Sequence, residues 1–218
     1  MIIDALERPQ TRGEEIANSV SHGLGFAALA TVSPYLITSA SSRYHDPAIT
    51  AGVCTFAFTA TFLYLSSAIF HALPYGGRAK KTFAVIDHAA IFLMIAGTYT
   101  PFTLGVLRGG WGWSLFAVVW AFALAGVCLK LFHGVDRHRS LSLALYLGMG
   151  WLVLVAIGRV WARMPHAGFL LLVTGGILYS AGVPFYTSKK KLFHHFVWHL
   201  FVIGGTACHF LAVLWYAA

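Results

Sequence analysis

Seven long apolar stretches, joined only by short connections, dominate this sequence and limit what it can fold into. A bilayer core needs about 20 mostly apolar residues in helical conformation. The stretches that meet this length are Val20–Ala40, Ala48–His71, Phe83–Leu107, Trp111–Phe132, Leu141–Trp161, Gly168–Tyr186 and His195–Ala217. The connections are too short to hold a soluble domain. We therefore predict an all-α integral membrane protein, with a single seven-helix transmembrane domain over residues 1–218.

The composition excludes most other classes of protein. Of the 218 residues, 58% are hydrophobic and only 10% are charged, whereas a soluble domain carries roughly 25% charged residues. This deficit argues against an ordinary cytosolic enzyme, a disordered chain and a nucleic-acid-binding protein. The net charge of +8 is then best explained by basic loops that orient the chain in the membrane.

The basic residues are distributed unequally between the two sides of such a bundle. One side carries eleven of them: Arg8, Arg12, Arg78, Lys80, Lys81, Lys130, Arg137, Arg139, Lys189, Lys190 and Lys191. The other side carries four: Arg43, Arg108, Arg159 and Arg163. Because cytoplasmic loops are enriched in Lys and Arg, we expect the short N-terminal segment 1–19 to be cytoplasmic and the C-terminus to lie outside.

Ionisable residues within the apolar stretches are candidate functional residues, because a charge in the bilayer is costly. Asp87 is the acidic exception, and His71, His195 and His199 lie at the ends of other stretches. Measured from the nearest basic flank at 1.5 Å per residue, Asp87, His71 and His199 all lie roughly 9–12 Å deep. Three helices that are distant in sequence thus bring polar groups to one level of the membrane.

The spacing of the histidines suits a metal ion. His195 and His199 are four residues apart, so they share one helical face at a separation of about 6 Å, the spacing at which two imidazoles bind one zinc ion. His71 supplies a third nitrogen, and three histidines with an open fourth position describe a catalytic zinc site. Asp87 is a candidate general base, and Ser67 a candidate oxyanion donor. The alternative is that these histidines hydrogen-bond neighbouring helices and serve only to hold the bundle together.

A second polar group lies at the start of the first stretch. Glu15, Asn18 and His22 are spaced three and four apart and therefore line one helical face, at about the depth of the other polar residues. We interpret them as capping and interhelical hydrogen-bonding residues rather than direct substrate contacts. His209 lies about 15 Å beyond His199 along the helix, too far to join the same site, and is interpreted as an interhelical hydrogen-bonding residue. His88 is rotated about 100° from Asp87 and is left out of the site.

Taken together, these motifs resemble the hemolysin III family, within the progestin and adipoQ receptor superfamily, over nearly the whole chain. The segments that carry the resemblance are Glu14–Gly23, Ser67–His71, Asp87–Ile91, Ala96–Phe102 and His195–His199 with His209 and Phe210 following. The resemblance implies a zinc ion held by the histidine of an SxxxH motif and two histidines of an HxxxH motif, with an aspartate approaching through water. Matched to this sequence, these are His71, His195, His199 and Asp87, with Ser67 as the serine. We expect a multi-pass protein of the bacterial inner (plasma) membrane, and the basic flanks beside these residues place the metal site in the cytoplasmic leaflet.

Three functions are consistent with such a chain. The superfamily is similar to the alkaline ceramidases, so the first hypothesis is an intramembrane zinc-dependent hydrolase of lipid amide or ester bonds, with a role in membrane lipid homeostasis and a membrane lipid as substrate or ligand. The second is a non-enzymatic receptor or sensor in which zinc is structural. A pore-forming cytolysin or a transporter has less support, because the stretches are typical of permanently inserted helices and the polar residues cluster in one leaflet.

Overall fold

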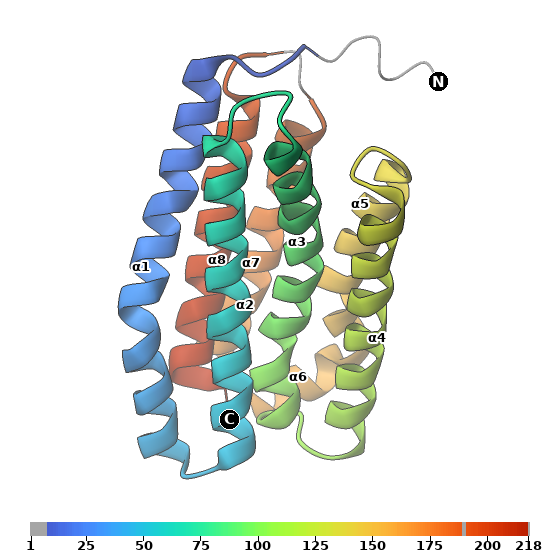
Figure 1. Cartoon of the computed structure of the whole chain (residues 1–218). Coiled ribbons are helices and arrows are strands. Elements are labelled where there is room, and N and C mark those ends of the chain that lie inside the picture. The colour runs from blue at the N-terminus through green and yellow to red at the C-terminus, as the bar shows by residue number, and fades with distance from the viewer. Residues whose placement is uncertain (1–7, 189–190, 218) are drawn as a thin grey trace.

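A computed structural model describes residues 8–188 and 191–217, and every regular element within these ranges is helical (Figure 1). The elements are α1 (Arg12–Tyr44), α2 (Pro47–Ala72), α3 (Arg78–Leu104), α4 (Gly110–His133), α5 (Arg139–Gly150), the 3₁₀ helix η2 (Leu152–Ala156), α6 (Ile157–Arg163), α7 (His166–Thr187) and α8 (His194–Tyr216). Counting α5, η2 and α6 as one span, seven helical segments among these residues are long and apolar enough to cross a membrane. The predicted all-α fold with seven spans is confirmed.

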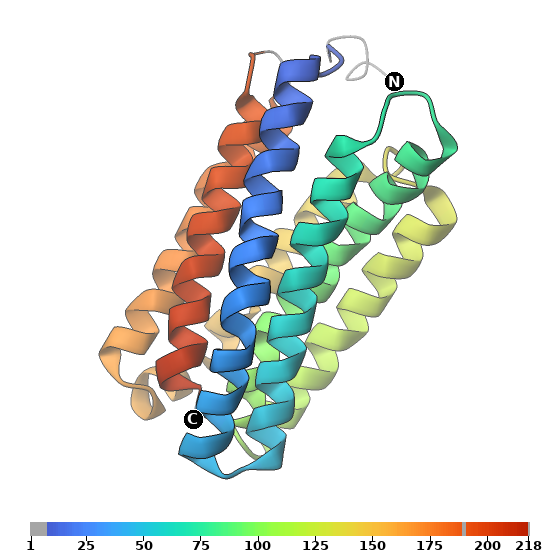
Figure 2. The ribbon, with the colours of Figure 1, turned by 60° about the vertical axis from the view of Figure 1, so that its left-hand side comes forward.

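The spans form a bundle in which the first and last helices are neighbours. Helix α1 packs against both α2 and α8, α2 packs against α3, and α7 packs against α8, as the two views of the ribbon show (Figures 1 and 2). The described chain starts at one end of the bundle and finishes at the other. We call the end that holds the start of α1, the α2–α3 connection and the start of α8 the N-terminal end.

Helix α1 begins at Arg12, well before the predicted start at Val20, because the preceding residues form a capping box. The Thr11 hydroxyl accepts from the Glu14 backbone N–H at 3.3 Å, and the Glu14 carboxylate accepts from the Thr11 N–H at 2.9 Å. This reciprocal pair satisfies two amides that a helix start leaves without partners. The helix therefore extends through the polar segment that contains Glu15.

The buried core runs through the bundle, and one of its closest contacts is between α2 and α3. Phe56, Ala60 and Tyr64 of α2 are almost completely buried. A Cβ atom placed on Gly97 of α3 would lie 1.9 Å from the Thr59 hydroxyl oxygen, so only glycine permits this approach. Small residues at such contacts let membrane helices pack closely where water provides no driving force.

The fifth span differs from the prediction, because it is broken rather than continuous over Leu141–Trp161. Helix α5 ends at Gly150, and a 3₁₀ segment precedes α6. The Tyr99 hydroxyl of α3 donates to the Gly150 carbonyl at 2.9 Å and accepts from the Val153 N–H at 2.9 Å. Backbone groups that leave a helix inside a membrane need such partners. Tyr99 thereby satisfies the backbone at the break.

Candidate metal centre and its cavity

Three histidines from two helices meet at the N-terminal end of the bundle. His71 lies in the last turn of α2, and His195 and His199 lie in the first turns of α8. Each offers one ligand atom, and these atoms all lie within 4.8 Å of one another. The ring centroid of His71 is 5.1 Å from that of each of the other two. The three histidines can therefore bind a single metal ion.

The contacts of His71 leave one of its ring nitrogens available to a metal. Its Nδ1 lies 2.7 Å from a carboxylate oxygen of Glu15 on α1, and the other carboxylate oxygen accepts from Lys80 of α3 at 2.9 Å. The opposite nitrogen, Nε2, is buried and has no hydrogen-bonding partner among the described residues. A buried polar atom without a partner is rare and calls for an explanation, and a bound metal ion is one.

Besides the other two histidines, His199 contacts residues of α1. The Ser21 hydroxyl oxygen lies 3.1 Å from His199 Nδ1, and the His22 ring stacks on the His199 ring at a centroid distance of 3.5 Å. Both ring nitrogens of His22 are buried without a partner in the described part of the chain. Asn18 donates to the Gln10 side chain at 2.5 Å, while its own amide oxygen has no partner there.

The predicted residues divide into two groups around a cavity of about 140 Å³. Five of them line it: His22, Ser67, Asp87, His195 and His199. The other three, which are Glu15, Asn18 and His71, are not among its lining residues. Asp87 and Ser67 are both buried and line the same cavity. The structure therefore brings the whole predicted set to one end of the bundle, with Glu15 behind His71 rather than in the cavity.

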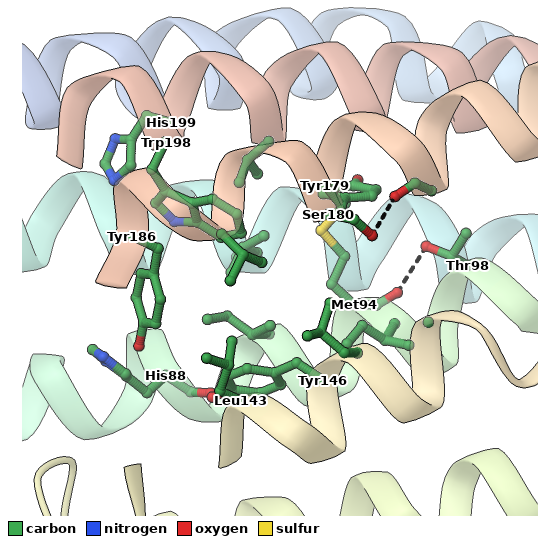
Figure 3. A pocket seen from close by; sticks show the side chains of 18 of the residues that line it. His88, Met94, Thr98, Leu143, Tyr146, Tyr179, Ser180, Tyr186, Trp198 and His199 are labelled. Atoms are coloured by element: carbon green, nitrogen blue, oxygen red, sulfur yellow. Dashed lines mark hydrogen bonds between the residues drawn. The ribbon is translucent and has the colours of Figure 1, made fainter. Parts of the chain in front are cut away.

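Most of the remaining cavity wall is apolar or aromatic. Figure 3 shows Tyr186 and Trp198 on one side of the cavity and Tyr146 and Leu143 on the other, with Met94 farther along. A second cavity of about 80 Å³ continues the space around the break in the fifth span. The residues that line both are Thr98, Tyr99, Gly150, Trp151, Gly176 and His209. A mostly apolar wall with a few polar side chains is typical of a site for a small molecule.

Besides His22, two further histidines outside the cluster border the cavity. The expectation for His209 is confirmed, because its Nε2 hydrogen-bonds the Leu172 carbonyl of α7 at 3.2 Å. His88, which sequence reasoning left out, lines the cavity, and its Nδ1 lies 3.6 Å from the Asp87 carboxylate. A cavity contacts more than one face of a helix, so rotation by one residue did not remove His88 from it. Its position next to Asp87 in the sequence was the signal that could have identified it as a cavity residue.

Comparison with known proteins places this architecture in a family. A family profile described as Haemolysin-III related matches residues 10–210. The chain belongs to the haemolysin III family. Among its relatives, the Hemolysin-3 homolog of Bacillus subtilis is 43% identical over 93% of this chain and 94% of its own length. Hemolysin-3 of Bacillus cereus is 40% identical over 93% and 91%. The human Monocyte to macrophage differentiation factor is 29% identical over 69% and 64%.

The predicted family is thus confirmed, and this haemolysin III protein is a multi-pass membrane protein with a histidine cluster that can hold a metal ion. The matched segment contains every residue of the predicted site, from Glu15 to His199.

Proposed function

We propose that this chain binds a zinc ion through His71, His195 and His199 and hydrolyses an amide or ester bond of a membrane lipid, contributing to membrane lipid homeostasis. One observation carries the proposal: three histidine ligand atoms lie within 4.8 Å of one another, and two of these histidines, His195 and His199, line a largely apolar cavity. Neither half of this arrangement is sufficient, because histidine clusters also hold helices together and apolar cavities also bind lipids without reaction.

The donor set fits zinc. Imidazole nitrogens suit zinc among the divalent metals, and three histidines with an open position are typical of catalytic zinc sites. The buried, unpartnered Nε2 of His71 supports a ligand at this point. When bound, zinc supplies a Lewis acid that polarises a carbonyl oxygen and makes water more acidic.

The residues around the cluster supply the remaining roles. Asp87 lines the cavity and is the acceptor for a proton taken from the attacking water. Ser67 lines the same cavity and stays the predicted oxyanion donor. His22 presents two unpartnered ring nitrogens at the same end of the cavity and can hydrogen-bond the polar part of a substrate.

A lipid is the substrate class that matches the cavity. The apolar wall suits an acyl chain, whereas Asp87, Ser67 and the histidines suit a carbonyl group at its polar end. A water-soluble substrate would leave the apolar part of the cavity unfilled. Membrane lipid is accordingly the proposed partner.

We further propose that the protein resides in the bacterial plasma membrane with its N-terminus in the cytoplasm, so that the metal site lies in the cytoplasmic leaflet. The supporting observation is that Arg12, Lys80, Lys130 and Arg139 belong to helix ends at the N-terminal end of the bundle. Lys189 and Lys190 of the predicted set lie outside the described residues. Alkaline phosphatase fused after the last span should be active if this orientation is correct, and inactive if it is reversed.

The first experiment is elemental analysis of detergent-purified protein. We expect about one zinc per chain in the wild type and a loss of most of it in the His195→Ala/His199→Ala variant. His209→Ala is the matched control, because this half-buried histidine lies on the same helix but outside the cluster. Folded wild-type protein without zinc, or full retention of zinc in the double variant, would refute the assigned ligands.

Hydrolysis is tested next, with lipid amides and esters presented to the protein in mixed micelles. Asp87→Asn should retain zinc but lose most of the turnover, and unchanged turnover would exclude Asp87 as the proton acceptor. If zinc is present and no lipid is cleaved, the alternative gains support. In that case zinc is structural and the protein is a sensor whose helices α2 and α8 are joined by the metal.

A further inference from the structure

Helix α1 contributes no member of the histidine cluster, yet it contacts two of the three members. Glu15 accepts from Nδ1 of His71 on α2 at 2.7 Å, and Ser21 lies 3.1 Å from Nδ1 of His199 on α8. These contacts are made because α1 runs beside both helices (Figure 2). In both histidines, the ring nitrogen that contacts α1 is Nδ1.

Each contact determines which ring nitrogen carries the proton. A carboxylate only accepts hydrogen bonds, so the Nδ1 of His71 must donate to Glu15. The Ser21 hydroxyl has one proton, and the nearer acceptor for it is the Asn18 carbonyl at 2.9 Å, compared with 3.1 Å to His199 Nδ1. With the proton on that bond, Ser21 accepts from His199. Both neutral rings thus carry their proton on Nδ1, and each Nε2 keeps the lone pair that a metal requires.

The orientation of Glu15 is itself fixed by Lys80. The ammonium group of Lys80 donates to the second carboxylate oxygen at 2.9 Å and lies 4.4 Å from the centre of the Phe70 ring. Both Glu15 and Lys80 are buried, so water does not compete for either group. With both oxygens engaged, Glu15 cannot turn away from His71 without leaving a buried cation unpaired, which is strongly unfavourable.

We propose that Glu15 and Ser21 are positioning residues that set the tautomers of His71 and His199, so that both rings present Nε2 to the metal. The consequence for metal affinity rests on the proposed zinc function, but the tautomers themselves do not. Partners of this kind are typically worth about 10–100-fold in metal affinity. Glu15 and Ser21 thus act through the ligands and touch neither metal nor substrate.

Glu15→Gln is the sharpest perturbation, because Lys80 decides how the new amide is oriented. Lys80 can only donate, so it takes the amide oxygen and leaves the NH₂ group facing His71 Nδ1. The ring must then accept at Nδ1, which moves its proton to Nε2. A second change, Lys80→Met, frees the amide oxygen to accept from His71 again. We therefore expect the Glu15→Gln/Lys80→Met variant to recover the original tautomer.

The tautomers can be measured without metal by ¹⁵N NMR of protein labelled at histidine, in detergent micelles. The signals of His71 and His199 are assigned by their loss in His71→Gln and His199→Gln variants. We expect Nδ1–H tautomers for both in the wild type, a reversed tautomer for His71 in Glu15→Gln, and restoration in the double variant. An Nε2–H tautomer in the wild type, or an unchanged His71 in Glu15→Gln, would overturn the proposal.

Zinc affinity is then measured by competition with a chromophoric chelator. Glu15→Gln and Ser21→Ala should bind zinc about 10–100-fold more weakly. Ser19→Ala is the matched control, because the Ser19 hydroxyl donates to the Ala68 carbonyl of α2 and links the same helices without contacting a histidine. Equal losses in Ser19→Ala and Ser21→Ala would assign the effect to helix packing and overturn the proposal. If the wild type binds no zinc, the proposed function fails, and the NMR experiment still decides the tautomers.

Discussion

Replacing Tyr99 with Phe tests how the broken fifth span is tolerated in the membrane. The substitution removes one hydroxyl and keeps the aromatic ring, so packing is nearly unchanged. It leaves the Gly150 carbonyl and the Val153 N–H without their partner. Neither group has an obvious replacement in the chain, because the Leu154 N–H, which would bond Gly150 in an α-helix, instead bonds the Trp151 carbonyl at 3.0 Å.

The expected loss follows from these two bonds. A buried polar group left unpaired costs about 1–3 kcal/mol, whereas side-chain hydrogen bonds within membrane proteins average only about 0.6 kcal/mol. Tyr99 lines both cavities, and water there can solvate the exposed groups, so the lower value is the better guide for each bond. We expect Tyr99→Phe to lower the free energy of unfolding by about 1–2 kcal/mol. The lower limit is the sum of two average bonds, and the upper limit applies if water solvates the exposed backbone groups incompletely.

The assay is equilibrium unfolding in mixed micelles, followed by far-UV circular dichroism as the fraction of denaturing detergent rises. Tyr35→Phe is the control, because Tyr35 is 64% exposed on the outer face of α1 and should lose almost nothing. A loss for Tyr99→Phe that equals that of the control would refute the idea that Tyr99 satisfies the backbone at the break.

Three further predictions follow from other parts of the bundle. Removing metal with a chelator should lower the unfolding temperature, because a ligand present at 100 times its Kd stabilises the native state by about 2.7 kcal/mol; the shift should be absent in His195→Ala/His199→Ala. Arg108 hydrogen-bonds Asp46 and lowers the pKa of that carboxyl from its ordinary 3.8. The stability that this pair contributes is therefore complete above pH 3.8 and is lost as the pH falls through the lower pKa of the folded state. Asp46→Asn should flatten this acid dependence in unfolding curves. Gly175→Ala should lower the free energy of unfolding by about 1–3 kcal/mol, because the new Cβ would lie 2.5 Å from the His209 ring. Gly148→Ala is the control in the same unfolding assay and should be tolerated, because the space around Gly148 is open.

The sequence was sufficient to predict the spans and the residues that gather at one end, because both follow from distances along the helix axis. His71 and His199 were matched by their depth, and depth is nearly independent of how helices rotate. The break after Gly150 could not be predicted in this way, because its stabilisation comes from Tyr99 on another helix. A hydropathy pattern does not record such a tertiary hydrogen bond.

The contacts around the cluster were harder to predict, because they depend on which helices are neighbours. Glu15 was recognised as an interhelical residue, and it does bond α2 and α3. Ser21 carried no signal, since a serine in a membrane helix usually bonds its own backbone, as Ser21 also does with Asn18. Its second contact, with His199, exists only because the first and last helices lie side by side.

That neighbourhood of the first and last helices also has a consequence for biosynthesis. The chain enters the membrane from its N-terminus, so α1 and α2 are in place long before α8 leaves the ribosome. Two of the three clustered histidines lie on α8, and a chain interrupted after α7 retains only His71. The histidine cluster is therefore assembled only once α8 has been inserted, and a metal held there would distinguish chains that contain an inserted α8 from chains that stopped before it.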